Sequence, residues 1–398
     1  MNDPIRPELA LAAAREEFPG VKNWIYLETS AWGLVPAAAR AALNRCLDLQ
    51  IEGNFDKDAM GEVVQRVRTK FAQLVRAHPD EIAIVKNVSE GANAVAASIL
   101  WGRGENAIIC SAVDHPNCIY ALYNMRDRYG VDVREIPARG YAMPVEEIIA
   151  AMDERTKLVM APSVPFSTGL RTDLKSIGEA CHRRGIQFFV DGAQSVGALD
   201  TDVNADKIDS LAVASSKYLC GPHGFGFLYM RRELAQQMQP AYMARYSIDL
   251  RGVHEGDAGG ERYKLKDGAE RFDIGSYNYL AAHAVEVSLD LLLAHGTRAI
   301  ENHVLALAHK FAKGLRVLGL PLLAGEVGSH LSQVVIVGGT GGRYDSPGVM
   351  KSLYDYLHSN RVKVSMRRGR LRFSFHVYNT EQEVDEVISL IRAWIQKC

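Results

Sequence analysis

The chain has 398 residues, of which 47% are hydrophobic and 23% charged, a composition typical of a globular protein large enough for two domains. Its 46 basic and 47 acidic side chains leave a net charge of -1, which gives no electrostatic reason to expect nucleic acid or an anionic membrane as a partner. Small molecules and other protein chains remain as candidate partners.

The sequence carries no signal of export or membrane insertion. Its first residues lack the basic start and apolar run of a secretory signal, and no apolar stretch reaches the length of about 18 residues that a membrane span needs. Its cysteines form no CxxC pair and no dense disulfide framework. These features favour a reducing, cytoplasmic location. The cysteines are Cys46, Cys110, Cys118, Cys181, Cys220 and Cys398.

Short β-branched runs alternate with amphipathic stretches through the first two-thirds of the chain. Several runs are apolar along their whole length, as strands are when helices cover both faces of a parallel sheet. The alternation predicts a doubly wound, mostly parallel α/β domain. The predicted strands span residues 81–85, 106–111, 131–137, 157–161, 186–190, 211–215 and 224–230. Predicted helices between them span residues 117–129, 145–152 and 174–184.

After residue 275 the pattern mixes longer helical stretches with short strands, which predicts a smaller α+β domain. Helices are predicted at 279–293, 300–318, 349–359 and 381–395, and strands at 333–337 and near Val362 and Leu371. The segment 247–270 is rich in glycine and charge and is expected to be a mobile or interfacial loop.

We therefore expect three parts. Residues 1–20 form an N-terminal segment that packs with the small domain, residues 21–275 form the large cofactor-binding domain, and residues 276–398 form the small C-terminal domain.

An acidic residue follows the very apolar strand predicted at 186–190. Ligands of open α/β sheets bind beyond the carboxyl ends of the strands, and Asp191 lies at such an end. A buried carboxylate needs a partner, because an unpaired buried charge is costly. A protonated pyridine nitrogen would be such a partner and would make its ring an electron sink, which is the task of pyridoxal phosphate (PLP).

Lys217 follows the next strand, within a run of small hydroxylated residues and ahead of the glycine-rich segment 221–226. A lysine at a strand end can form a Schiff base if its amine stays unprotonated, and Ser215 and Ser216 are candidates to hydrogen-bond a phosphate. Taken alone, Lys217 fits a solvated loop lysine better. Together with Asp191 it favours a covalently held cofactor.

The segment 86–91 leaves a strand and opens a helix. Backbone N–H groups at this helix start, including that of Glu90, and the Ser89 hydroxyl make a candidate site for the cofactor phosphate. Ser89 also fits an ordinary helix cap, and the two roles are compatible.

These segments resemble the class V aminotransferase family of fold-type I PLP enzymes, which includes cysteine desulfurases, cystine C–S lyases and isopenicillin N epimerase. The resemblance runs over nearly the whole chain, from Tyr26 to Thr380. It implies the PLP-dependent transferase fold. It also implies that Asp191 pairs with the pyridine nitrogen, that Gln194 hydrogen-bonds the ring hydroxyl and that Ala193 packs under one ring face.

Two further segments are similar to this family. The resemblance places His115 on the other ring face, whereas a histidine that merely caps the loop after the strand at 106–111 is the alternative. The segment 271–276 resembles one that reaches into the neighbouring subunit's site, so Ser276 would donate to that subunit's phosphate. The resemblance thus implies an obligate homodimer.

The substrate contacts are also implied by the resemblance. Arg370 and Arg372 share one face of a predicted strand, and an arginine fork matches a carboxylate bidentately. By resemblance Arg372 binds the substrate α-carboxylate, while a structural ion pair is the alternative, more so for Arg370. The substrate side chain is expected near Ala31 and Trp32, although Trp32 also fits a core or dimer-interface aromatic. No metal is expected.

The sequence departs from the desulfurases at several positions. The stretch 360–369 is short and has no cysteine, which argues against a persulfide-forming desulfurase. Phe166 stands where desulfurases place an asparagine, and Ser216 where they often carry histidine. Overall resemblance favours a C–S lyase that acts at Cα of a thio-substituted amino acid.

Alternatives stay open, because removal of the α-proton by Lys217 begins each reaction of this kind. Loss of a β-substituent gives a lyase, reprotonation at the cofactor carbon an aminotransferase, and reprotonation at Cα an epimerase; the fold does not separate them. An aminotransferase is the main alternative because Arg367 or Arg368 is available for a second carboxylate. A PLP-binding protein without activity is the last alternative, against which the intact Asp191 and Lys217 argue.

Overall fold

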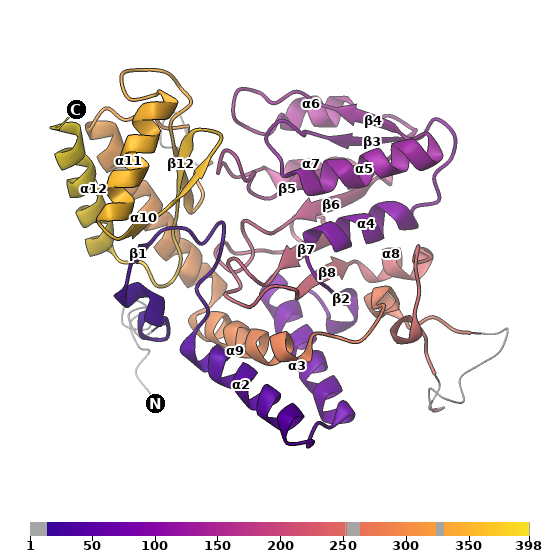
Figure 1. The fold of residues 1–398 in the computed structure, drawn as a ribbon. Coiled ribbons are helices and arrows are strands. Elements are labelled where there is room, and N and C mark those ends of the chain that lie inside the picture. Colours follow the sequence, from indigo (N-terminus) through magenta and orange to yellow (C-terminus); the bar gives the residue numbers. More distant parts are fainter. Residues whose placement is uncertain (1–13, 251, 253–262, 324–329, 398) are drawn as a thin grey trace, which may run out of the picture.

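The computed structural model describes residues 14–250, 252, 263–323 and 330–397. The chain folds into a large part around an extended sheet and a smaller part, formed mainly by the C-terminal third, beside it (Figure 1). Within the described ranges no helix combines the length and hydropathy that a membrane span needs. No group of three histidine, cysteine or acidic side chains is gathered for a metal ion among the same residues.

The large part is built on one sheet of seven strands, and all seven are those predicted from the sequence. They are β2 (Ile82–Val85), β3 (Asn106–Ile109), β4 (Asp132–Glu135), β5 (Thr156–Pro162), β6 (Gln187–Asp191), β7 (Ser210–Ala214) and β8 (Gly226–Met230). Their order is β2-β8-β7-β6-β5-β3-β4. Neighbours from β7 to β4 are parallel, and β8 is antiparallel to both of its neighbours. The prediction of a mostly parallel α/β sheet is confirmed.

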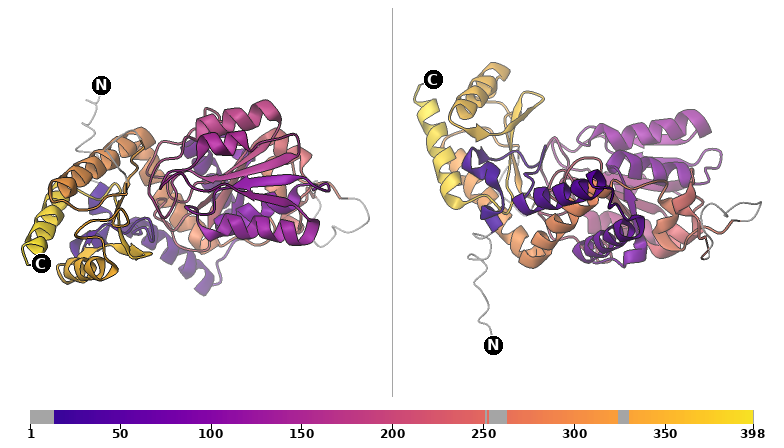
Figure 2. Two further views of the ribbon diagram at one scale, coloured as in Figure 1. Left: turned by 90° about the horizontal axis from the view of Figure 1, so that it is seen from above. Right: turned by 60° about the horizontal axis from the view of Figure 1, so that its bottom comes forward.

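Alternate residues of each strand enter separate hydrophobic cores on the two faces of the sheet. In β7, Leu211 and Val213 pack on one face, and Ala212 between them packs on the other. This alternation explains the unbroken apolar runs, since a strand covered on both faces has no polar side. One face is covered by α4 (Val88–Ser98) and α5 (Pro116–Tyr129), and the other by α6 (Val145–Ala150) and α7 (Leu174–Arg184). Figure 2 shows helices on both sides of the sheet.

Three longer helices pack together at one end of the large part (Figure 1). The sequence predicted α9 (Tyr279–His295) but neither α2 (Ala37–Ile51) nor α3 (Lys57–Val75). Asp56 caps α3 by accepting hydrogen bonds from the N–H groups of Asp58 and Ala59. A short helix, α8 (Arg232–Gln237), follows β8.

The smaller part combines an antiparallel sheet with three helices. The helices are α10 (Thr297–Val317), α11 (Pro347–Ser359) and α12 (Glu381–Ile395). The sheet has the order β11-β12-β9, with β9 (Val334–Val337), β11 (Ser365–Arg367) and β12 (Arg370–Ser374). This mixture of helices and strands confirms the predicted α+β pattern.

An N-terminal segment joins the smaller part. β1 (Ile25–Tyr26) pairs in parallel with β10 (Val362–Lys363). Upstream, Arg15 forms an ion pair with Glu383 at 2.8 Å, and the Phe18 ring meets Tyr378 at 4.8 Å. Residues 1–13 lie outside the described residues. The predicted domain boundaries stay predictions.

The loop predicted at 247–270 lies partly outside the described residues, which omit 251 and 253–262. Its described ends meet in an antiparallel bridge between Ile248 and Leu265. Short 3-10 helices complete the fold: Pro19–Lys22, Pro79–Glu81, Arg245–Ser247 and Gly268–Phe272.

Candidate active site

One edge of the large sheet gathers most of the residues predicted to bind the cofactor. β2 and β7 are both antiparallel to β8, so they run in the same direction as each other and as β3, β5 and β6. The carboxyl ends of these five strands therefore lie at one edge, where ligands of such sheets bind. Asp191 is the last residue of β6, and the segments that follow the other strands carry Ser89, His115, Phe166 and Lys217.

Asp191 and Lys217 form the electrostatic centre of this edge. Burial raises the pKa of the Asp191 carboxyl, and the charge of Lys217 offsets part of that rise. Burial also lowers the pKa of the Lys217 amine, and the charges of Arg372 and Arg367 lower it further. Asp191 Oδ1 accepts a hydrogen bond from the N–H of Ala193 at 2.9 Å, and no cation among the described residues lies within ion-pair distance of it. The carboxylate therefore has room for a cationic partner.

The chain around Lys217 is held by a close approach of two backbones. The Gly33 N–H donates to the carbonyl oxygen of Ser216 at 2.8 Å. A Cβ added at Gly33 would lie 1.9 Å from the carbonyl oxygen of Lys217. Only glycine fits here, because any side chain would collide with backbone that cannot rotate away.

Gln194 is fixed from two sides and keeps one free acceptor. Its Nε2 donates to the carbonyl of Ser30 at 3.0 Å, and Gln333 Nε2 donates to its backbone carbonyl. The Gln194 Oε1 atom is buried and has no partner among the described residues. A buried acceptor without a donor is costly, so this atom fits the hydroxyl of a bound ring. Ala193, one residue earlier, is buried beside it.

His115 is the N-cap residue of α5 and lies against an aromatic ring. Its Nδ1 accepts a hydrogen bond from the N–H of Asn117, and its ring meets Phe166 edge-on at 5.1 Å. The capping role and a ring-stacking role are thus compatible. Burial, with the charge of Lys217, lowers the pKa of His115, so the imidazole is neutral near pH 7.

Asp114 was not assigned a role from the sequence. Its Oδ1 accepts from the His115 N–H at 2.6 Å, while its buried Oδ2 has no partner among the described residues. Burial and the charge of Asp191 raise the pKa of Asp114. A carboxyl at this position therefore retains a proton to higher pH than an exposed aspartate does.

The residues predicted to contact the phosphate differ in whether their hydroxyl groups are already hydrogen-bonded within the protein. Asn87 rather than Ser89 caps α4, by accepting from the Glu90 N–H at 3.1 Å. The Ser89 and Ser216 hydroxyls make no hydrogen bond to a described residue. The Ser215 hydroxyl donates to the carbonyls of the glycine-rich loop, 2.8 Å from that of Phe225. Ser215 therefore has no proton left for a phosphate, which favours Ser216 and Ser89 as the donors.

Glu90 also differs from the expectation of a free anion site. Its carboxylate accepts from the N–H of Lys86 at 2.5 Å, and its own N–H is bonded to Asn87. Both groups of Glu90 are thus occupied within the helix start.

Arg372 is a buried arginine without a carboxylate partner. Its Nε donates to Ser365 Oγ at 3.0 Å and its Nη1 to the carbonyl of Phe166 at 3.2 Å. No described carboxylate lies within 4.0 Å of it, and burial lowers its pKa to about 10. The guanidinium stays charged at neutral pH and suits an anionic group of a substrate.

The remaining residues predicted for the site, Ala31, Trp32 and Ser276, are partly or fully exposed. Ala31 is half-buried, and Trp32 is 54% exposed with its ring against His223 at 4.4 Å, which excludes the core role for Trp32. Ser276 is exposed in the loop before α9 and lines a cavity of about 230 Å³ together with Lys86 and neighbouring residues.

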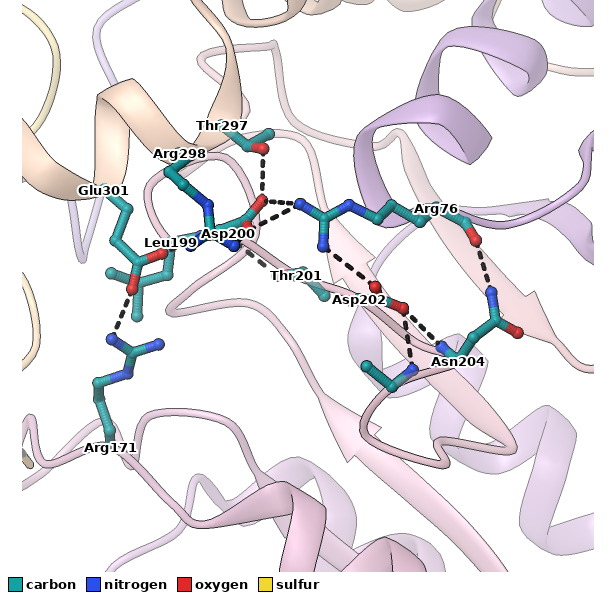
Figure 3. Close-up of polar contacts among 11 residues, drawn as sticks. Arg76, Arg171, Leu199, Asp200, Thr201, Asp202, Asn204, Thr297, Arg298 and Glu301 are labelled. Carbon is teal, nitrogen blue, oxygen red and sulfur yellow. Dashed lines mark hydrogen bonds and ion pairs between the residues drawn. The ribbon is translucent and has the colours of Figure 1, made fainter.

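An ion-pair network anchors the segment that follows Gln194 (Figure 3). The Asp200 carboxylate accepts from Arg76 at the end of α3 and from Thr297 and Arg298 at the start of α10, at 2.6 to 2.9 Å. Glu301 of α10 accepts from the N–H of Asp200 at 3.1 Å. The network thus ties the site segment to the smaller part.

These residues fit PLP on three counts. Asp191 is a buried carboxylate with no described cation at ion-pair distance, Gln194 Oε1 is a buried acceptor with no described donor, and Lys217 is an amine with a lowered pKa and no described hydrogen-bond partner. A pyridinium, a ring hydroxyl and an aldehyde are the complementary groups.

A family model described as "Aminotransferase class-V" matches residues 53–387 of the chain. The chain belongs to the class V aminotransferase family. It is therefore a PLP-dependent enzyme. The predicted family and cofactor are confirmed, and the site residues stay predictions that the geometry makes specific.

Two relatives of this class V enzyme align along almost their full length. An uncharacterized aminotransferase, YcbU of Bacillus subtilis, is 29% identical over 95% of this chain and 96% of its own. A probable cysteine desulfurase of Methanothermobacter thermautotrophicus is 26% identical over 93% and 94%.

Solved structures support the fold of the class V enzyme. An apo cysteine desulfurase from Thermococcus onnurineus NA1 superposes with a TM-score of 0.83 at 21% identity, covering 100% of both chains. The cystine C–S lyase C-DES, in complex with cysteine persulfide, gives 0.82 at 21% identity over 94% of this chain and 99% of its own. The predicted PLP-dependent transferase fold is confirmed.

Proposed function

We propose that this enzyme catalyses β-elimination from a thio-substituted amino acid and does so without forming a persulfide on one of its own cysteines. The observation that carries the proposal is the hairpin of β11 and β12. Arg367 pairs with Arg370, which leaves a turn of two residues, Arg368 and Gly369, at the start of the strand that carries Arg372. A turn this short has no room for a loop bearing a nucleophilic cysteine.

The other cysteines support the same conclusion. All five cysteines in the described ranges are buried and free. Burial raises the pKa of their thiols, to about 11 for Cys110 and about 12 for Cys181. The thiolate is the nucleophile of sulfur transfer, so a buried thiol with a raised pKa is a poor acceptor. Cys398 lies outside the described residues.

The contacts of the chain's residues support a role for each of them. Arg372 holds the substrate α-carboxylate, as its lack of a described carboxylate partner and its position beside Phe166 support. The Lys217 amine takes the proton from Cα, since its lowered pKa keeps part of it neutral. Asp191 would hold PLP through its pyridine nitrogen, where the carboxylate would stabilise a positive charge.

Bound PLP would supply an electron sink for the charge that develops at Cα. The Cβ–S bond then breaks with its electron pair on sulfur. Overall, a cysteine conjugate and water give pyruvate, ammonia and a thiol. The proton that Lys217 takes from Cα is then available to the leaving sulfur, which restores the neutral amine.

Aminotransfer is the second candidate function. It is favoured by the name of the relative from Bacillus subtilis and by Arg367 and Arg368, which offer a second carboxylate contact near Arg372. Epimerisation at Cα and an inactive PLP-binding protein are weaker candidates, because no residue distinguishes them. The decisive test incubates PLP-loaded enzyme with cystine or a cysteine conjugate. Pyruvate without an added 2-oxo acid supports elimination, whereas turnover that requires a 2-oxo acid retires it in favour of aminotransfer.

The assembly and location are further parts of the proposal. We infer a homodimer in which Ser276, exposed in its own subunit, donates to the phosphate in the neighbouring site. Free, buried cysteines in the described chain support a reducing, cytoplasmic compartment.

A further inference from the structure

The smaller part of the fold places arginine side chains without described carboxylate partners near Lys217. In the hairpin of β11 and β12, Ser365 lies opposite Arg372. One step along, Arg367 lies opposite Arg370. Alternation along each strand puts these four side chains on one face. This face is turned toward the large domain, because Arg372 donates to the carbonyl of Phe166.

Arg367 contributes to the field of the site and has no carboxylate partner. Its charge lowers the pKa of both Lys217 and Arg372. Its guanidinium hydrogen-bonds the adjacent Met366 carbonyl at 2.9 Å, and no carboxylate in the described part of the chain lies within 4.0 Å. Glu28 is the acidic group whose charge reaches Arg367 and Arg372, and burial raises its pKa. One carboxylate therefore faces two guanidinium groups and the Lys363 amine.

Arg368 is held at the rim by the turn itself. Its φ of 49° and that of Gly369, 75°, are both left-handed, a conformation that an arginine rarely adopts. The turn places the guanidinium carbon 6.0 Å from the centre of the Phe166 ring, with Nη1 3.4 Å from the carbonyl of Ala112. The Phe166 ring contacts His115. Arg368 thus lies one side chain away from the predicted cofactor-stacking residue.

We propose that Arg367 and Arg368 form a second anion subsite and that the preferred substrate carries an acidic group on its side chain in addition to its α-carboxylate. The inference rests on the proposed function, since it assigns Arg372 to the α-carboxylate. Guanidinium groups without carboxylates beside a reactive site favour a ligand that brings the missing negative charge. The acidic group would sit at the outer end of the substrate, because both arginines are exposed.

The test uses a pair of probes that differ only in charge. S-carboxymethylcysteine ends in a carboxylate, and S-carbamoylmethylcysteine ends in an amide of the same shape. Two readouts are taken on PLP-loaded enzyme: pyruvate release, and equilibrium binding followed by the absorbance of the bound cofactor. We expect the native enzyme to prefer the acid by at least about fivefold in both kcat/KM and affinity, the gain of a charge-assisted contact at a site rim.

Variants assign the preference to its residues. Arg367→Gln and Arg368→Gln should each reduce it, and the double variant should remove it, so that the acid and the amide are handled alike. Arg361→Gln is the matched control, because Arg361 is also an exposed arginine in a left-handed conformation, with φ of 58°, and lies between α11 and β10 rather than in the β11–β12 hairpin. It should keep the full preference.

The outcomes separate this inference from the proposed reaction. Tighter binding of the acid without pyruvate would retire elimination and retain the subsite. Equal handling of both probes would overturn the subsite even if pyruvate appears. Failure of the acid probe to bind, or a preference that survives in the double variant, would overturn it as well.

Discussion

Asp191 and Lys217 offset each other's charge in a buried site: burial raises the pKa of the carboxyl and lowers that of the amine, and each group opposes the shift of the other. The charges of Arg372 and Arg367 lower the pKa of the Lys217 amine further. The result is an amine that is neutral more often than an exposed lysine at the same pH. Neutral amines are the form that reacts with an aldehyde.

Capture of PLP should therefore have a pH dependence that reports Lys217. The rate should rise with pH as the amine loses its proton, with a midpoint below the ordinary lysine pKa of about 10.4. Mixing apo-protein with PLP at a series of pH values and following the absorbance of the bound cofactor measures this. Lys217→Ala should show neither covalent capture nor turnover at any pH, and a variant that kept either would remove Lys217 from its role.

We expect that a lysine cannot replace Arg372 in substrate binding. Arg372→Lys keeps a positive charge but loses the planar fork and its bonds to Ser365 and Phe166. We expect KM to rise by at least about tenfold, the worth of a charged hydrogen bond, while the spectrum of bound PLP stays unchanged. Arg370→Lys is the control on the same strand and should leave KM nearly unaltered. An unchanged KM in Arg372→Lys would assign the α-carboxylate to another residue.

The ends of several elements could be read from the sequence because local signals mark them. α7 ends at Arg184 as predicted, since Gly185 follows in a left-handed conformation. α12 begins at Glu381 as predicted, because Thr380 and Glu383 form a capping box. The seven strands were equally legible from their apolar runs.

Features that depend on distant contacts could not be read in this way. β11 is a polar, arginine-rich stretch whose strand conformation comes from pairing with β12. The Ser215 hydroxyl donates to carbonyls of the glycine-rich loop because residues 221–226 fold back toward it, and no local signal predicts this. Likewise Asp114 gives no sign in the sequence that its buried oxygen lacks a partner.

Gly33 should prove indispensable for holding the lysine loop. Gly33→Ala would push a methyl group to within 1.9 Å of the Lys217 carbonyl, so the loop must move and cofactor affinity should fall by at least about tenfold. Gly61→Ala is the matched control: its position in α3 has nothing within 4 Å of an added Cβ and no unusual φ. That variant should bind PLP normally and be slightly more stable, because alanine favours helix. Equal PLP affinities for the two variants would contradict the steric argument.

Asp200 should contribute to stability through charge rather than shape. Its carboxylate is 6% exposed and joins Arg76 to Arg298, so Asp200→Asn keeps the shape and removes the charge that both arginines need. We expect a loss of about 2 kcal/mol at pH 7, less than for a fully buried pair because both arginines reach solvent. The pKa of Asp200 is lowered in the folded protein, so this contribution is present above the ordinary aspartate value of about 4 and is lost as pH falls through the lowered one. Urea unfolding of the native protein and of Asp200→Asn, at pH 7 and at a pH below the lowered pKa of Asp200, measures this difference in the free energy of unfolding.

The control is Asp290→Asn, which removes a partner of Lys70 that is 57% exposed. It should lower the free energy of unfolding by less than about 0.5 kcal/mol. If Asp200→Asn and Asp290→Asn unfold at the same midpoint near neutral pH, the network in Figure 3 does not tie the site segment to α10.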